Sequence, residues 1–135
     1  MELKQDCIRY VLLCLENQKI GMMYSGFSED QLVKVFSNDT YSDDDVRYTL
    51  YQLANGGMIS AKSAIAPNKL GIKQLQVFDI TWKGHEFLDT IRDDKVWSKT
   101  KKVASTFSSV SLGILQTIAS KVIVGLIKEQ TGLPL

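Results

Sequence analysis

Three observations predict an α+β fold that is mostly helical. Apolar residues recur at three- and four-residue spacing in the first third of the chain and again in the last third, which is the period of an amphipathic helix. Between these segments, two strand-like runs surround a turn sequence that contains Pro, Asn and Gly. The chain has 135 residues, of which 44% are hydrophobic and 23% are charged, as expected for a folded protein with one main core.

Three helices are expected before the strands. The first covers residues 3–16, where apolar residues share one face. The second starts at residues 28–31 (Ser-Glu-Asp-Gln), which form a capping box, and ends near Phe36. The third starts at Ser42, which is followed by three aspartates that favour the positive end of the helix dipole, and it stops at Gly56.

A β-hairpin is expected next, with strands over residues 58–65 and 72–80 and a turn over residues 67–71. Thr81 can cap a fourth helix, which continues or bends near Asp93 into a further helical segment. The order of three helices, hairpin and helix is that of a winged helix-turn-helix. In that arrangement the third helix is the candidate DNA-reading helix and the hairpin turn is the tip of the wing.

The segment TWKGHEFLDTIRDD (residues 81–94), followed by Trp97, resembles the signature of a family of short uncharacterised proteins of bacteria and their prophages. The similarity extends to the Ser-Asp-Asp-Asp start of the third helix and covers about residues 1–115. The resemblance implies a winged-helix fold and a mobile-element context. It implies no known activity and no catalytic residues.

Charge is distributed unevenly along the chain, although the net charge is only +1. Residues 1–57 hold five basic and nine acidic groups, whereas residues 58–135 hold eleven basic and six acidic groups. Lysines of the hairpin and of the segment after the fourth helix could contact phosphates. The candidate DNA-binding residues are Lys62, Lys69, Lys73, Arg47, Lys99, Lys101 and Lys102. Specific base reading is disfavoured, because the third helix begins with Asp43, Asp44 and Asp45 and offers only Arg47 as a donor.

The C-terminal segment over residues 110–127 is predicted to be a helix that is apolar over most of its circumference. Its apolar residues recur at 3-4-3-4 spacing, as a coiled-coil seam requires. The candidate oligomerisation residues are Leu112, Leu115, Ile118, Ala119, Val122 and Leu126. Three interpretations remain open: packing onto the first helix of the same chain, self-association, and binding to a membrane surface. A membrane span is not expected, because eight of the eighteen uncharged residues over 103–120 are polar.

Few residues suggest enzymatic chemistry. His85 with Glu86 has no recognisable nucleophile or phosphate loop to act with, and a structural role is preferred. The three consecutive aspartates 43–45 suit helix capping better than cation binding, because they point in different directions. No catalytic residue, metal or cofactor is therefore expected.

The two cysteines are expected to be ordinary buried thiols. Cys7 and Cys14 are seven residues apart on a predicted helix, about 10.5 Å at roughly 1.5 Å per residue, which is too far for a disulfide. Charged residues within the first seven positions interrupt any apolar leader, so a cytoplasmic protein is expected.

We therefore expect a winged helix-turn-helix-like domain over residues 1–94 and a C-terminal helical extension over residues 95–135. The leading functional hypothesis is a non-enzymatic protein-interaction module of prophage or mobile-element type. It would form a homo-oligomer through its C-terminal helix and bind an unidentified protein partner. The alternative is a winged-helix DNA-binding regulator that uses the lysines named above. Membrane association is not expected.

Overall fold

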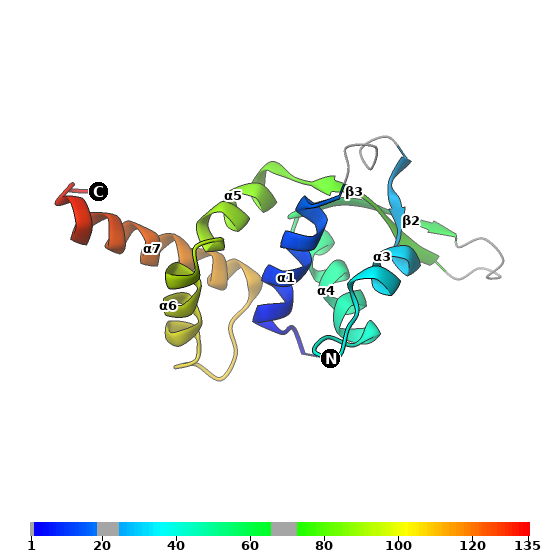
Figure 1. The fold of residues 1–135 in the computed structure, drawn as a ribbon, viewed down its shortest axis with the longest axis horizontal. Coiled ribbons are helices and arrows are strands. Elements are labelled where there is room, and N and C mark those ends of the chain that lie inside the picture. The colour runs from blue at the N-terminus through cyan, green and yellow to red at the C-terminus, as the bar shows by residue number, and fades with distance from the viewer. Residues whose placement is uncertain (1, 19–24, 66–72) are drawn as a thin grey trace. The chain divides into compact units, whose positions relative to one another are not determined.

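The computed structural model describes residues 2–18, 25–65 and 73–135. Its elements, labelled as in Figure 1, are α1 (Gln5–Glu16), β1 (Phe27–Ser28), α3 (Glu29–Phe36), α4 (Asp43–Asn55), β2 (Ile59–Ile65), β3 (Lys73–Ile80), α5 (Trp82–Ile91), α6 (Asp94–Ala104) and α7 (Leu112–Thr131). The α+β fold that is mostly helical is confirmed. The predicted turn over residues 67–71 lies outside the described residues.

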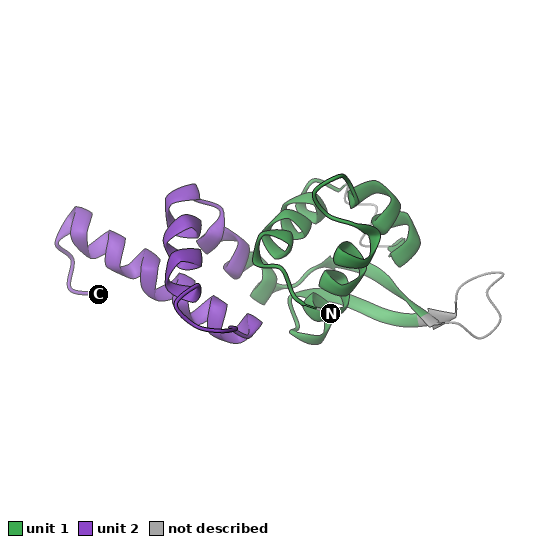
Figure 2. Ribbon diagram, turned by 90° about the horizontal axis from the view of Figure 1, so that it is seen from below, with its two compact units in different colours: residues 1–85 green, residues 86–135 purple. Residues whose placement is uncertain are grey.

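The chain divides into two compact units, residues 1–85 and residues 86–135 (Figure 2). The division falls inside α5, whereas the sequence analysis places the boundary after Asp94. Each unit has its own helices and buried side chains, and each is described by itself below.

The first unit combines α1, α3 and α4 with a three-stranded antiparallel sheet in the order β1-β3-β2 (Figure 1). α4 packs against both α1 and α3, and all three helices contact the sheet. The apolar side chains buried in these three helices are Cys7, Ile8, Val11, Leu12, Leu15, Leu32, Val33, Phe36, Val46, Leu50 and Leu53. These are the apolar positions at helical spacing in the sequence, so the core of this unit follows directly from that spacing.

The strand β1 is a finding that the sequence analysis missed. Phe27 pairs with Val77 and Ser28 with Gln76, so β3 becomes the central strand. Two residues are too few for a periodic pattern, and only the pairing with β3 defines them as a strand.

The alternation along β3 is irregular because the pairing with β2 shifts once. Leu75 and Val77 are buried on one side of the strand, and the next buried residue is Ile80, which has the opposite parity. The register moves from Ser60 opposite Asp79 to Ala61 opposite Val77, which leaves Phe78 as an extra residue. An extra residue of this kind changes which side chains face the core.

The second unit contains most of α5 together with α6 and α7. Its helix starts are capped, since the Asp93 carboxylate accepts a hydrogen bond from Val96 N (3.0 Å) and the Ser111 hydroxyl accepts one from Ile114 N (3.2 Å). α6 packs against α7. The buried residues of this unit are Phe87, Leu88, Ile91, Val96, Trp97, Thr100, Ala104, Leu115, Ala119 and Leu126. Among the described residues, no helix combines the length and hydropathy that crossing a membrane requires.

Candidate functional site

One side of α4 carries acidic, basic, aromatic and amide side chains that are exposed or half-buried. The opposite side of the helix, with Val46, Leu50 and Leu53, is fully buried. The residues on the outer side lie three or four positions apart, which brings them into one row. They line a surface hollow of about 360 Å³, called the α4 face here, and are Asp44, Arg47, Tyr48, Tyr51 and Gln52. Asp43 lies exposed at the start of the same helix.

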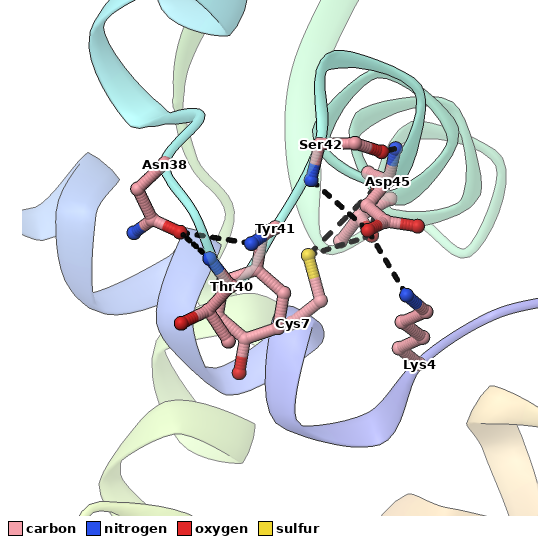
Figure 3. Close-up of polar contacts among 8 residues, drawn as sticks. Lys4, Cys7, Asn38, Thr40, Tyr41, Ser42 and Asp45 are labelled. Carbon is pink, nitrogen blue, oxygen red and sulfur yellow. Dashed lines mark hydrogen bonds and ion pairs between the residues drawn. The ribbon is translucent and has the colours of Figure 1, made fainter.

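The start of α4 is held by a complete capping box (Figure 3). The Ser42 hydroxyl accepts a hydrogen bond from Asp45 N (3.2 Å), and the Asp45 carboxylate accepts one from Ser42 N (3.0 Å). Lys4, the residue that precedes α1, donates a hydrogen bond from its ammonium group to the same carboxylate at 3.0 Å. The predicted capping role of this acidic run is therefore confirmed for Asp45.

Asp45 differs from its two acidic neighbours because its charge is already compensated. The hydrogen bond from the Ser42 backbone, followed by the contact with Lys4, lowers the pKa of the Asp45 carboxyl. Asp43 and Asp44 are exposed. The negative charge that this helix start presents to a partner therefore comes chiefly from Asp43 and Asp44.

The turn that leads into α4 is also ordered by side chains. The Asn38 side-chain oxygen accepts hydrogen bonds from Thr40 N (2.9 Å) and Tyr41 N (2.8 Å), as drawn in Figure 3. The Tyr10 ring lies 5.0 Å from the Tyr41 ring between centroids. These contacts fix the direction of α4 relative to α3.

Arg47 is engaged by carboxylates of the same unit. Its guanidinium contacts Glu29 and also Asp30, at 3.2 Å, both in the first turn of α3. Glu29 is only 2% exposed, and its other oxygen accepts a hydrogen bond from Leu75 N at 2.9 Å. One buried carboxylate thus joins α3, α4 and β3. Because Arg47 compensates this charge, its first role is structural.

Arg47 is the only base-reading donor that the sequence offered on this helix, and it remains a predicted DNA contact. In the structure, however, two acids face its guanidinium. The role of Glu29 as a buried link between helices and sheet is not predicted from the sequence. Its partners lie 18 and 46 residues away along the chain, and no local pattern indicates them.

The other candidate DNA contacts in the described residues lie on the strands β2 and β3 and on α6. Lys62 is exposed on β2, with its ammonium 5.7 Å from the centroid of the Phe78 ring. Lys69 lies outside the described residues, as does the side chain of Lys73. On α6, Lys99 and Lys102 are exposed, and the Lys101 ammonium lies 5.8 Å from the centroid of the Trp97 ring.

The candidate oligomerisation residues fall into two groups. Leu115, Ala119 and Leu126 are buried within the chain, on the helix that packs against α6. Leu112, Ile118 and Val122 are half-buried. The structure therefore uses half of the predicted seam inside the chain, and α6 is a packing partner that the sequence analysis had not considered.

The signature segment builds a structural joint at the start of α5. Thr81 donates its hydroxyl to the Gly57 carbonyl (2.6 Å), and the same oxygen accepts a hydrogen bond from Gly84 N (3.1 Å). Thr81 N donates to the Met58 carbonyl at 3.0 Å. A methyl group at Gly84 would overlap that carbonyl oxygen, so the close approach requires glycine.

Two further side chains of the signature lie near the start of α5. His85 is half-buried in the first turn of α5, where its backbone N–H donates to the Thr81 carbonyl at 2.9 Å. Trp82 is 80% exposed. Across the described part of the chain, no three His, Cys, Asp or Glu side chains come together in a way that could hold a metal ion.

Both thiols are free, and the local environment of each makes it less acidic. Cys7 is fully buried, and Cys14 is half-buried. Burial raises the pKa of both thiols, so both are protonated at neutral pH and are weak nucleophiles. The predicted burial is confirmed for Cys7 and is only partial for Cys14.

The fold and the α4 face together define a small α+β protein that presents an acidic and aromatic helix surface. The chain belongs to the family described as hypothetical protein (DUF2513), whose model matches residues 2–111. It is similar to an uncharacterized protein of Haemophilus influenzae, with 30% identity over 128 residues that cover 91% of this chain and 96% of the relative. No solved structure matches the chain. The expected membership of an uncharacterised family is confirmed.

Proposed function

We propose that this protein is a non-enzymatic protein-interaction module that binds its partner through the α4 face, on a winged-helix-like unit formed by residues 1–85. The order of helices and strands in the described part of this unit, with three helices before two paired antiparallel strands, supports the winged-helix assignment. In a DNA-binding member of that architecture, α4 would enter the major groove. Its surface chemistry favours a protein partner instead.

The observation that carries the proposal is the division of charge on α4. Arg47 faces two carboxylates, while Asp43 and Asp44 remain exposed. A phosphate backbone approaching this surface would meet uncompensated negative charge without a free cation on the helix to offset it. A protein partner with a positively charged surface would be attracted to it.

The chemistry of the α4 face fits a partner surface that carries arginine or lysine. Tyr48 and Tyr51 offer aromatic rings against which a cationic side chain can pack, and Asp44 offers a carboxylate within the same row. Gln52 adds a hydrogen-bonding amide at the end of the row. Tyrosine is also among the residues that dominate protein interfaces.

Photo-crosslinking in host cells tests this proposal. Tyr48 is replaced by a benzoyl-phenylalanine crosslinker, and covalent products are identified by mass spectrometry. We expect a protein adduct that disappears when Asp44→Lys is added, because the carboxylate attracts the basic partner. Glu86→Lys is the matched control, since it makes the same charge change on an exposed residue of α5. Thermal unfolding of both variants shows that each remains folded.

Two results would contradict the proposal. One is a nucleic-acid adduct in place of a protein adduct at Tyr48. The other is a protein adduct that Asp44→Lys and Glu86→Lys reduce equally, because the charge of the α4 face would then play no specific part.

Homo-oligomer formation through α7 is the second part of this proposal. Leu115, Ala119 and Leu126 are already buried, so a second copy would contact the flank of the helix that holds Ile114, which is 53% exposed, and Ile118. Light scattering should then give a dimer mass for the natural chain and a monomer mass for Ile114→Lys with Ile118→Lys. A monomer mass for the natural chain would reject this part alone.

DNA binding is the second candidate function, and the exposed amines of Lys62, Lys99 and Lys102 favour it. These groups would contact phosphates without reading sequence. Retardation of duplex DNA should then weaken steeply with salt and should be lost in Lys62→Glu with Lys69→Glu and Lys73→Glu. The cytoplasmic location and the mobile-element context stay predictions.

A further inference from the structure

A groove of about 460 Å³ runs along α6 and α7 within the second unit. Its residues are Lys99, Lys102 and Val103 from α6, and Lys121, Val122, Gly125, Leu126 and Glu129 from α7. This set, called the α6–α7 groove below, does not overlap the α4 face. Its floor is apolar, and lysines from both helices surround it.

Gly125 occupies a place on this floor for which the packing of the chain gives no reason. It lies inside α7, where glycine is less favourable than alanine by about 0.5–1 kcal/mol. A Cβ built at Gly125 would meet no atom within 4 Å. The contrast with Gly84 is clear, because there the Met58 carbonyl leaves no room for a Cβ. A glycine with open space above it lets an incoming backbone come close to the helix.

The floor next to Gly125 is partly open to solvent. Val103 is 43% exposed and Val122 is half-buried, whereas Leu126 is only 9% exposed. These side chains form a concave apolar strip between two helices. This is the form of site into which an amphipathic helix inserts its apolar face.

The charge of the groove limits which helix can bind. Lys99, Lys102 and Lys121 are exposed, and Glu129 is the one acid that lines the groove with them. A ligand helix with carboxylates beside its apolar face would pair with these lysines. A second copy of α7 would bring Lys121 and Lys128 with it and so add positive charge to a positive surface.

We infer that the α6–α7 groove binds an acidic amphipathic helix of a partner protein. The ligand helix places small or branched apolar side chains over Val103 and Val122, crosses α7 closely at Gly125, and pairs its carboxylates with Lys99, Lys102 and Lys121. Concavity and an apolar floor favour this ligand over duplex DNA, which would use the lysines alone. The inference is independent of the proposed binding at the α4 face.

The test uses the full chain and a labelled synthetic helix of about five turns, roughly 18 residues, with leucine and alanine on one face and glutamate on both flanks. Binding is followed by fluorescence anisotropy. The comparison peptide has lysine in place of every glutamate. We expect saturable binding of the acidic peptide that weakens as salt is raised, and at least about tenfold weaker binding of the basic peptide.

Two sets of variants locate the binding. Gly125→Leu fills the groove, so it should weaken binding of the acidic peptide at least about tenfold. The variant should remain folded, because leucine is a better helix former than glycine. Lys99→Glu with Lys102→Glu should weaken binding by a similar factor. Lys95→Glu with Lys128→Glu makes the same change in net charge at exposed residues outside the groove and should have a much smaller effect.

Four results would overturn the inference. They are no saturable binding of the acidic peptide, equal binding of the two peptides, no effect of Gly125→Leu, and equal effects of the two lysine pairs. Binding of duplex DNA or of phosphatidylglycerol vesicles that Gly125→Leu abolishes, without peptide binding, would assign the groove to that ligand instead. A dimer that Gly125→Leu converts to a monomer would assign it to a second copy of the chain.

Discussion

The start of α4 and the surface of α7 use their side chains in opposite ways. At the start of α4, Ser42, Asp45 and Arg47 all have hydrogen-bond or ion-pair partners within the same unit. On α7, apolar residues extend beyond those that the chain buries, and Ile114 remains 53% exposed. A residue type alone therefore does not indicate function, because a charged side chain can stabilise the fold and an apolar one can be left unused by it.

The same contrast separates the residues within each region. Asp45 is compensated, whereas Asp43 and Asp44 are exposed. On α7, Leu115 is buried, whereas Val122 is half-buried and lines a groove. The residues that the fold leaves exposed or half-buried therefore carry most of both functional proposals, and the fully buried residues contribute most to stability.

The largest expected effect is at the buried carboxylate. Arg47→Met removes the main compensation of Glu29, which is 2% exposed, so unfolding should become easier by about 2–4 kcal/mol. Glu29→Gln added to Arg47→Met should restore part of this loss, because a neutral amide is less costly to bury than an unpaired charge. Urea denaturation of the single and double variants measures both steps. A loss below about 0.5 kcal/mol would show that Arg47 behaves as a surface residue.

A slightly smaller effect is expected at the joint between the end of α4 and α5. Gly84→Ala would force the Met58 carbonyl and the Ile80 side chain to move, and we expect a loss of about 1–3 kcal/mol. Gly125→Ala makes the same chemical change in α7, where a Cβ has open space, and should stabilise the protein by about 0.5–1 kcal/mol. Thermal unfolding measures the sign of the stability change in each variant. Equal changes for Gly84→Ala and Gly125→Ala would contradict the difference in packing.

A pH-dependent effect is expected at Asp45. Its pKa is lowered in the folded state, so its carboxylate stabilises the fold above the ordinary pKa of 3.8, and this contribution is lost as the pH falls through the lower folded pKa. Asp45→Asn should lack this part of the acid dependence. Denaturant midpoints between about pH 6 and about pH 2 test it. Asp43→Asn, two residues earlier in the same helical turn, is the control, and parallel curves for Asp45→Asn and the natural chain would be the opposing result.

The smallest expected effect is at Trp82. This side chain is 80% exposed, so Trp82→Ala should change the free energy of unfolding by no more than about 0.5 kcal/mol. Thr81 and Gly84, the signature residues on either side of Trp82, have structural contacts. The loss of stability in Trp82→Ala can therefore be compared directly with that in Gly84→Ala. A large loss of stability in Trp82→Ala would mean that the exposed indole contributes to the fold.

Local patterns in the sequence predicted the elements whose ends are set by their own residues. The capping box at Ser28 and the helix start at Ser42 are present as expected, and the third helix ends at Gly56. The hydroxyl of Thr81 accepts the predicted hydrogen bond at the start of α5. Each of these signals involves groups within a few residues of one another, so the sequence contains both partners side by side.

The sequence alone therefore predicts the described helices, the two long strands and the apolar faces, because hydrophobic period and capping act over short distances. The three-dimensional structure was needed to show that Phe27–Ser28 is a strand, that Arg47 compensates a buried Glu29, that Gly84 lies against a carbonyl and that α7 packs on α6. These outcomes depend on contacts between segments distant in the chain, or between two whole helices. Their free energies depend on distance and burial, which no local pattern records.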